Sequence, residues 1–241
     1  KYYQIRQTWL REQETNRMIQ FKDEEGKEIV INSCHPLNLA LLWLSTSMDI
    51  PGEDKLDRFG MAFLYGAWGG VHWKNQPQHW LSTEKSVCEW GGIKCNSKTK
   101  RVEDIILLQH GLKGSIPPEL GRWWKDTLKS LAIGYNSLGG SLPDTFYDFT
   151  QIVNVRLSVN QITGAISTKI GQLTSLKRME IDFNQLKGTL PTELGLLTNL
   201  DYLGLWDNAQ LEGTIPTEIA NMKGLRDLKI HGNKLTGTIP T

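Results

Sequence analysis

From Val102 to the end of the chain, apolar and polar positions follow a block that repeats along the sequence. Each block reads apolar-x-x-apolar-x-apolar-x-x-Asn, where x is any residue. The blocks begin at Val102, Leu128, Ile152, Leu176, Leu200 and Leu225, and these starts are 26, 24, 24, 24 and 25 residues apart. Self-similarity at a fixed period of this length is typical of a solenoid, in which each repeat buries its apolar face against its neighbours.

The pattern within each block predicts a short strand followed by a turn. Alternation of apolar and polar residues with a period of two is typical of a β-strand, and successive strands are expected to pair in parallel. The ninth position holds His110, Asn136, Asn160, Asn184, Asn208 and Asn233. Because asparagine carries both a donor and an acceptor, a buried column of it can satisfy the backbone groups of the turns. Most blocks continue into Gly-x-Ile/Leu-Pro, which argues against a helical array.

The period of the blocks falls within the range of leucine-rich repeats, about 20–29 residues. We therefore predict an α/β solenoid, a leucine-rich-repeat horseshoe of six repeats with a parallel concave sheet, over residues 102–241. Residues 33–101 lack the repeat and are predicted to form a helical cap on the first block. Apolar spacing places one helix after Pro36 and another at 54–65. For the tryptophans that follow, packing in the core of this cap is favoured over a ligand-stacking platform.

The three cysteines, Cys34, Cys88 and Cys95, leave at least one thiol unpaired within the chain or bonded to another chain. A disulfide between Cys88 and Cys95 would close a short loop and join the cap to the first block. A metal site is less favoured, because no second close pair of ligands accompanies these thiols. Such a disulfide predicts an oxidising compartment: an extracellular or membrane-anchored location or, as an alternative, an organelle lumen.

The segment Cys88-Glu-Trp-Gly-Gly-Ile-Lys-Cys95 resembles the N-terminal cap of plant-type extracellular leucine-rich-repeat proteins. In that family the two cysteines form a disulfide, and members include receptor ectodomains and protease-inhibiting wall proteins. The run from Pro36 through Ala40-Leu-Leu-Trp-Leu44, Asp57-Arg-Phe59 and Trp73 to Trp80 is similar to the cap of leucine-rich-repeat proteins from diatoms and related algae. The resemblance covers residues 33 to 241 and implies a module that binds a ligand.

Residues 1–32 lie outside this resemblance. The spacing of Tyr2, Ile5 and Trp9 predicts an amphipathic helix from Tyr2 to Gln20, although the periodicity is imperfect. Three roles stay open for this segment: packing on the cap, a stem from a membrane anchor that this sequence lacks, or partner binding.

No apolar run in the chain approaches the roughly 18 residues that a transmembrane helix needs. The sequence ends at Ile239-Pro-Thr241, in the middle of the repeat pattern. Because the last repeat of a solenoid needs a polar covering, we expect either further repeats or a partner at this end.

The third, fifth, seventh and eighth positions of each block are predicted to face the concave side. The candidate ligand-binding residues at these positions combine rigid aromatic anchors with charged groups, which suits a peptide, protein or glycan. They are Tyr135, Arg156, Arg178, Glu180, Asp182, Phe183, Tyr202, Trp206, Asp207 and His231. The alternative is that these side chains only pair with one another across adjacent strands.

A second candidate surface is the adjacent pair Trp123 and Trp124, in an insertion in the first block. Insertions in solenoids lie in loops on one face, so the pair is predicted either to form an exposed docking patch or to cover the groove between cap and repeats.

Charge and motif content narrow the function. Lys and Arg total 27 against 26 Asp and Glu, a net charge of +1, which gives no reason to expect nucleic acid as a partner. No nucleophile-histidine or phosphate-loop motif is present. His231 near Asp207 and Asp227 has the residue types of a catalytic dyad, but a lone histidine of this kind does not indicate catalysis. We expect no enzyme activity, cofactor or metal. The sequence favours a recognition module; the alternative is a structural or scaffolding subunit held by stable partner subunits.

Overall fold

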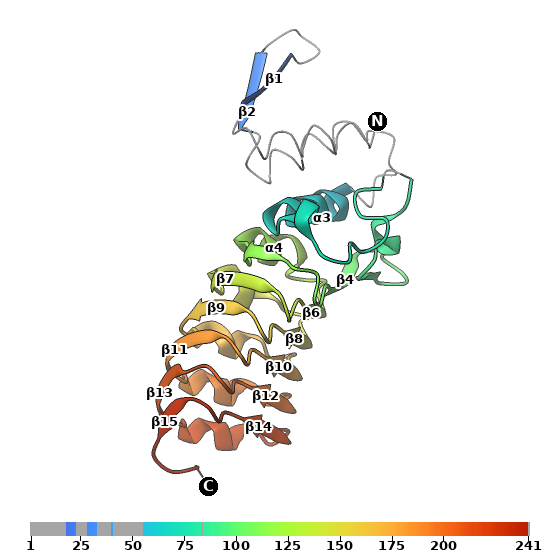
Figure 1. Ribbon diagram of the computed structural model, residues 1–241. Coiled ribbons are helices and arrows are strands. Elements are labelled where there is room, and N and C mark those ends of the chain that lie inside the picture. Colours follow the sequence, from blue (N-terminus) through green and yellow to red (C-terminus); the bar gives the residue numbers. More distant parts are fainter. Residues whose placement is uncertain (1–17, 23–27, 33–39, 41–54, 83, 241) are drawn as a thin grey trace.

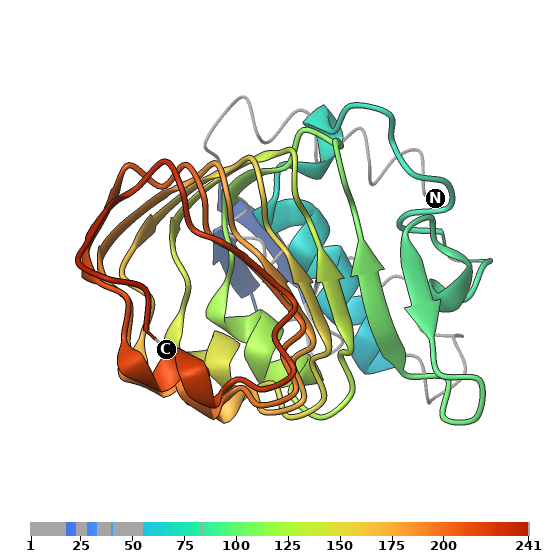
Figure 2. The same ribbon diagram turned by 90° about the horizontal axis from the view of Figure 1, so that it is seen from below.

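A computed structural model of the protein describes residues 18–22, 28–32, 40, 55–82 and 84–240, and only the backbone of the first two ranges (Figure 1). From residue 102 the chain winds into stacked coils, each with a strand on two of its sides (Figures 1 and 2). The first, fourth and sixth positions of the blocks point into the coil, as at the fully buried Leu176, Met179 and Ile181. The predicted leucine-rich-repeat solenoid is therefore confirmed.

The strand expected at the start of each block forms part of a seven-stranded sheet in the order β14-β12-β10-β8-β6-β4-β3. All neighbours pair in parallel except β3 and β4, which are antiparallel. The strands are β3 (Ile93–Cys95), β4 (Val102–Ile106), β6 (Ser130–Ala132), β8 (Asn154–Arg156), β10 (Arg178–Glu180), β12 (Tyr202–Gly204) and β14 (Asp227–Lys229). The pairing aligns equal positions of successive blocks, so that Arg178 lies opposite Tyr202 and Tyr202 opposite Asp227.

A second parallel sheet, which the block pattern did not predict, runs along another side of the coils in the order β15-β13-β11-β9-β7-β5. Its strands are β5 (Lys113–Ser115), β7 (Ser137–Ser141), β9 (Gln161–Gly164), β11 (Gln185–Thr189), β13 (Gln210–Thr214) and β15 (Lys234–Thr236). Most of these strands are followed by a proline that begins a short helix. The helices are α4 (Pro118–Trp124), η4 (Asp144–Asp148), η5 (Thr168–Gln172), η6 (Thr192–Leu196) and η7 (Thr217–Asn221). Ser167 stands where the proline is missing, and its hydroxyl accepts a hydrogen bond from the Lys169 N–H instead.

The asparagine column performs the predicted role. The Asn184 amide donates to the carbonyl of Ile181 in its own coil at 3.1 Å and to that of Leu157 in the preceding coil at 3.1 Å. Its side-chain oxygen accepts from the N–H of Ile162 at 2.9 Å. Asn160 and Asn208 repeat this arrangement, and each asparagine thereby ties two coils together.

Residues 55–101 lie against the first coil. Helix α3 (Lys55–Ala67) falls where a helix was predicted at 54–65, and the short helices η2 (Gly70–His72) and η3 (Val87–Glu89) follow it. Trp68, Trp73, Trp80 and Trp90 are all buried, as expected for residues that fill a core. The disulfide between Cys88 and Cys95 is present and lies between η3 and β3.

The predicted helix from Tyr2 to Gln20 is wrong at its end. Residues 18–20 belong to strand β1 (Met18–Lys22), which pairs antiparallel with β2 (Glu28–Asn32), and residues 1–17 lie outside the described part. The helix expected after Pro36 and the state of Cys34 also lie outside the described residues.

Candidate ligand-binding surface

Strands β8, β10, β12 and β14 bring most of the predicted site residues onto one face of the seven-stranded sheet. Third positions of successive blocks lie side by side, as do fifth positions, because the strands pair in register. Arg156 is opposite Glu180, and Arg178 is opposite Tyr202. We use the name central cluster for Arg156, Arg178, Glu180, Tyr202 and Lys229.

Within the central cluster, one carboxylate holds two guanidinium groups. Glu180 is buried and accepts a hydrogen bond from the Nε of Arg156 at 3.1 Å and another from the Nε of Arg178. Both arginines are about two-fifths exposed along their side chains, 42% and 43%. Because the shared carboxylate balances only one of the two positive charges, Glu180 and the two arginines together keep a net charge of +1, to which Lys229 adds another positive charge.

Tyr202 is covered by its neighbours in the central cluster. The guanidinium carbon of Arg178 lies 3.9 Å from the centre of the tyrosine ring, and the Lys229 Nζ lies 5.2 Å from it. The residue is only 7% exposed as a result. For Tyr202, therefore, the alternative of pairing across adjacent strands is what the structure shows, and the ring acts as a platform for cations rather than as an open anchor.

The open aromatic surface lies beside the central cluster. The indole of Trp206 stacks on His231 with ring centres 5.9 Å apart and an interplanar angle of 13°. Phe183 meets the same indole edge-on at 6.0 Å. The Lys229 Nζ is 5.5 Å from the Trp206 ring. Trp206 is half-buried, whereas Phe183 and His231 are exposed, so these three rings form an accessible patch that we call the aromatic patch.

Asp182 stands at the seventh position of its block, one coil before Trp206, and is buried. Its Oδ1 accepts a hydrogen bond of 2.6 Å from the Ser158 hydroxyl. Burial raises the pKa of Asp182, and the Ser158 hydrogen bond opposes that rise only in part. The buried Asp182 is therefore held by Ser158 and is not exposed for direct contact with a ligand.

The eighth positions form a column along one edge of this sheet, and their backbone conformation was not predicted. Tyr135, Val159, Phe183 and Asp207 all have positive φ angles, of 58°, 57°, 50° and 52°. Each donates its N–H to a carbonyl of the next coil at 2.8 to 3.0 Å. The three apolar members are 51%, 36% and 49% exposed.

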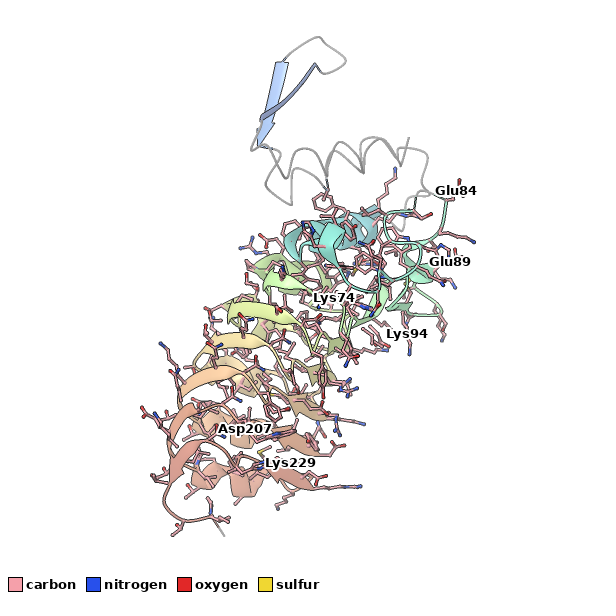
Figure 3. All side chains as sticks on the ribbon, viewed as in Figure 1. Lys74, Glu84, Glu89, Lys94, Asp207 and Lys229 are labelled. Atoms are coloured by element: carbon pink, nitrogen blue, oxygen red, sulfur yellow. A yellow bond between two sulfur atoms is a disulfide. The ribbon has the colours of Figure 1, made fainter. Side chains whose placement is uncertain are left out.

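Asp207 and Lys229 lie on neighbouring coils toward the C-terminal end of the stack (Figure 3). Asp207 is exposed, and its carboxylate forms no ion pair within the part of the chain that the structure describes. It stands next to Phe183 in the column of eighth positions, one coil further along. The column therefore passes from apolar side chains to a negative charge.

The exposed docking patch predicted at Trp123 and Trp124 is corrected by the structure. Trp124 is fully buried, and its indole N–H donates to Asp57 Oδ1 at 2.7 Å. Trp123 is half-buried and packs edge-on against Phe59 and Phe63 of α3, with ring centres 5.4 and 5.1 Å apart. The pair fills the contact between α3 and α4, which is the alternative that the sequence had left open.

Comparison with known proteins agrees with the fold. No protein family model matches the chain. Over 59 residues the chain is 41% identical to the LRR receptor-like serine/threonine-protein kinase FEI 2 of Arabidopsis thaliana, a match that covers 24% of this chain and 10% of that protein. The match lies in the leucine-rich repeats, and the repeats are of the plant type.

Two solved structures extend the comparison. The LRR ectodomain of the membrane receptor kinase GASSHO1/SCHENGEN3 from Arabidopsis thaliana, in complex with CASPARIAN STRIP INTEGRITY FACTOR 2, superposes with a TM-score of 0.64 at 29% identity over 83% of this chain and 22% of that one. The plant peptide hormone receptor RGFR1 in complex with RGF2 gives 0.58 at 31% identity over 64% and 27%. The chain thus spans 10% to 27% of the length of these three relatives. Within the described residues, no helix is long and apolar enough to cross a bilayer.

Proposed function

We propose that the chain is a non-catalytic recognition module that binds a peptide or protein segment across the seven-stranded sheet. The observation that carries this proposal is the aromatic patch of Phe183, Trp206 and His231, which stays accessible beside a cationic cluster. Aromatic rings held rigidly in this way are the side chains that dominate binding energy at protein interfaces. The similar receptor RGFR1 is described as a peptide hormone receptor.

Eight of the ten predicted site residues divide into two groups in this proposal. Trp206, Phe183 and His231 contact the ligand, together with the exposed parts of Arg156 and Arg178. The buried Glu180, Asp182 and Tyr202 instead hold the contacting residues in place. Rigid support of this kind lowers the entropy that binding would otherwise cost.

A peptide is favoured over a glycan by the charge arrangement. The guanidinium groups of Arg156 and Arg178 share one carboxylate and retain capacity to donate hydrogen bonds to carbonyl or carboxylate oxygens. An extended peptide presents such oxygens along its whole length, whereas a neutral glycan offers mainly hydroxyls.

Residues 33–101 complete the module as a cap in this proposal, and residues 1–32 form a separate segment preceding it. Helix α3 covers the first coil, and the Cys88–Cys95 disulfide fixes the loop beside it. A disulfide persists in an oxidising compartment, so we place the chain on the extracellular side or in an organelle lumen. We also propose that the cap is similar to the cap of leucine-rich-repeat proteins from diatoms and related algae.

Selection from a random peptide library displayed on phage, with the whole chain immobilised, tests the proposed function. We expect peptides whose affinity falls at least about tenfold in Trp206→Ala, as for a central aromatic anchor. Leu196→Ser is the matched control, because Leu196 is an exposed apolar residue on η6, outside the sheet. Circular dichroism confirms that both variants are folded. Selection of no peptide, or equal binding by Trp206→Ala, would overturn the proposal, and a glycan array then tests the other ligand class.

A further inference from the structure

The column of eighth positions has features that the proposed peptide site leaves unexplained. We call Tyr135, Val159, Phe183 and Asp207 the ridge. They occupy four consecutive coils, and the backbone hydrogen bonds between coils fix their register. Three of the six large hydrophobic residues exposed in the described part of the chain belong to it. A row of neighbouring apolar side chains exposed to solvent marks an interaction site more often than a single scattered apolar residue does.

The backbone of the ridge is held in a conformation that side chains other than glycine rarely adopt. A positive φ is least favourable for β-branched and bulky residues, and here it holds Val159 and Phe183. In the last block the same position is occupied by Gly232, with a φ of 69°, so the fold accepts glycine there. Gln109, at the eighth position of the first block, has a φ of 60°, so this conformation belongs to the repeat, and the fold holds Val159 and Phe183 in it despite their side chains.

The spacing of the ridge selects the conformation of its ligand. Paired strands lie about 4.8 Å apart, so Tyr135 and Phe183, two coils apart, are separated by about 9.6 Å. A polyproline II helix advances about 9.3 Å in one turn of three residues, which presents every third side chain to the ridge. Side chains on one face of an extended strand recur at about 6.6 Å, which does not match the separation of Tyr135 and Phe183. Positions i and i+7 of an α-helix are about 10.5 Å apart, which matches it less closely than one turn of polyproline II does.

We propose that the ridge binds a proline-rich peptide segment in the polyproline II conformation, with prolines three residues apart seated on Tyr135 and Phe183. Aromatic side chains are the surfaces on which such segments dock, and the preformed helix loses little entropy on binding. Val159 lies between the two rings and forms the floor for the residues between the prolines.

The end of the ridge sets the polarity of the ligand. Asp207 follows Phe183 by one coil, or about 4.8 Å, and its carboxylate has no ion-pair partner among the described residues. A basic residue one or two positions beyond the second proline would reach it. The ligand is therefore a segment with proline at every third position and a lysine or arginine beside the last of them.

This inference rests on the proposed function, and isothermal titration with synthetic peptides tests it. The probe is a peptide with proline at every third position and one arginine beside the terminal proline, prepared with the arginine at either end. Its controls are the same peptide with alanine for proline, and a helical peptide with phenylalanines seven residues apart. The protein variants are Tyr135→Gly and Phe183→Gly, which the positive φ accommodates, Asp207→Asn, and Leu196→Ser as the control outside the ridge.

We expect one of the proline peptides to bind the native chain, and the alanine peptide to bind at least about tenfold more weakly. Tyr135→Gly and Phe183→Gly should each lower the affinity about tenfold. Asp207→Asn should lower it about threefold at low salt and less at high salt. No binding of either proline peptide, tighter binding of the helical peptide, or unchanged affinity in both glycine variants would overturn the inference. If library-selected peptides depend on Trp206 and Phe183 while neither proline peptide binds, the proposed function stands and only this inference fails.

Discussion

Substitution of Asp57 by asparagine should release the contact between α3 and the first coil. Asp57 is fully buried, and its two oxygens accept four hydrogen bonds. Oδ1 accepts from the Trp124 indole at 2.7 Å and from Arg101 Nη2 at 3.2 Å, while Oδ2 accepts from Arg101 Nε at 3.0 Å and from the Val102 N–H at 3.1 Å.

The size of the effect follows from the groups that lose their partner. Asparagine has the same shape, but it replaces one carboxylate oxygen by an amide that can only donate, so two of the four donors face another donor. Removing one charge of a buried ion pair costs about 3–5 kcal/mol. The Arg101 side chain is 31% exposed and can regain water, which favours the lower end of that range, about 3 kcal/mol. For a chain of this size such a loss lowers the Tm by about 6–12 °C.

Guanidinium denaturation followed by tryptophan fluorescence and near-ultraviolet circular dichroism measures this loss, because Trp124 lies directly at the altered site. The control is Glu89→Gln, which breaks the exposed Lys85–Glu89 pair at 3.2 Å and should leave the denaturation midpoint unchanged. A loss in Asp57→Asn below about 1 kcal/mol, the contribution of one ordinary hydrogen bond, would refute the reasoning.

Three further substitutions follow from the same structure. Asn208→Leu leaves the Leu186 N–H without its partner and removes one of two amide donors from each of the Ile181 and Leu205 carbonyls, so chemical denaturation should show a loss of about 1–3 kcal/mol. Burial raises the pKa of Asp182 above its unfolded value, so the native chain loses stability as pH rises through that range. Asp182→Asn should then be more stable than the native chain at pH 7 and equal to it below about pH 3.9, as thermal melts across this range would show. Replacing Cys88 and Cys95 by serine should lower the free energy of unfolding by about 2.5 kcal/mol, the chain entropy of so short a loop.

The parts of the fold that repeat could be predicted from the sequence. The alternation of Leu176, Met179 and Ile181 marks the strand, and Asn184 marks the turn, because each serves the same purpose in every coil. The second sheet could not be predicted, because its strands carry few apolar residues and are held by backbone pairing between coils. The burial of Trp124 depends on Asp57, 67 residues earlier in the chain, and no local pattern encodes such a contact.

The candidate site could be located by position but not by role. Counting along each block correctly placed Arg178, Tyr202 and Trp206 on one sheet face. It could not separate the covered ring of Tyr202 from the open one of Trp206, because that difference depends on where Arg178 and Lys229 extend. The positive φ of Val159 could not be predicted from the sequence either, since β-branched residues normally favour extended backbone.

The two roles of the repeat, stability and recognition, fall on different positions of the same block. Buried first, fourth, sixth and ninth positions hold the coils together, and the candidate binding residues stand at the third, fifth, seventh and eighth positions. At the eighth position the N–H is bonded to the next coil while the side chain is exposed, as at Tyr135 and Phe183. Side chains there are therefore mounted on backbone that the fold has already ordered. A ligand that contacts Phe183 or Tyr135 meets a surface that needs little further ordering, and affinity should depend more on side-chain chemistry than on conformational adjustment.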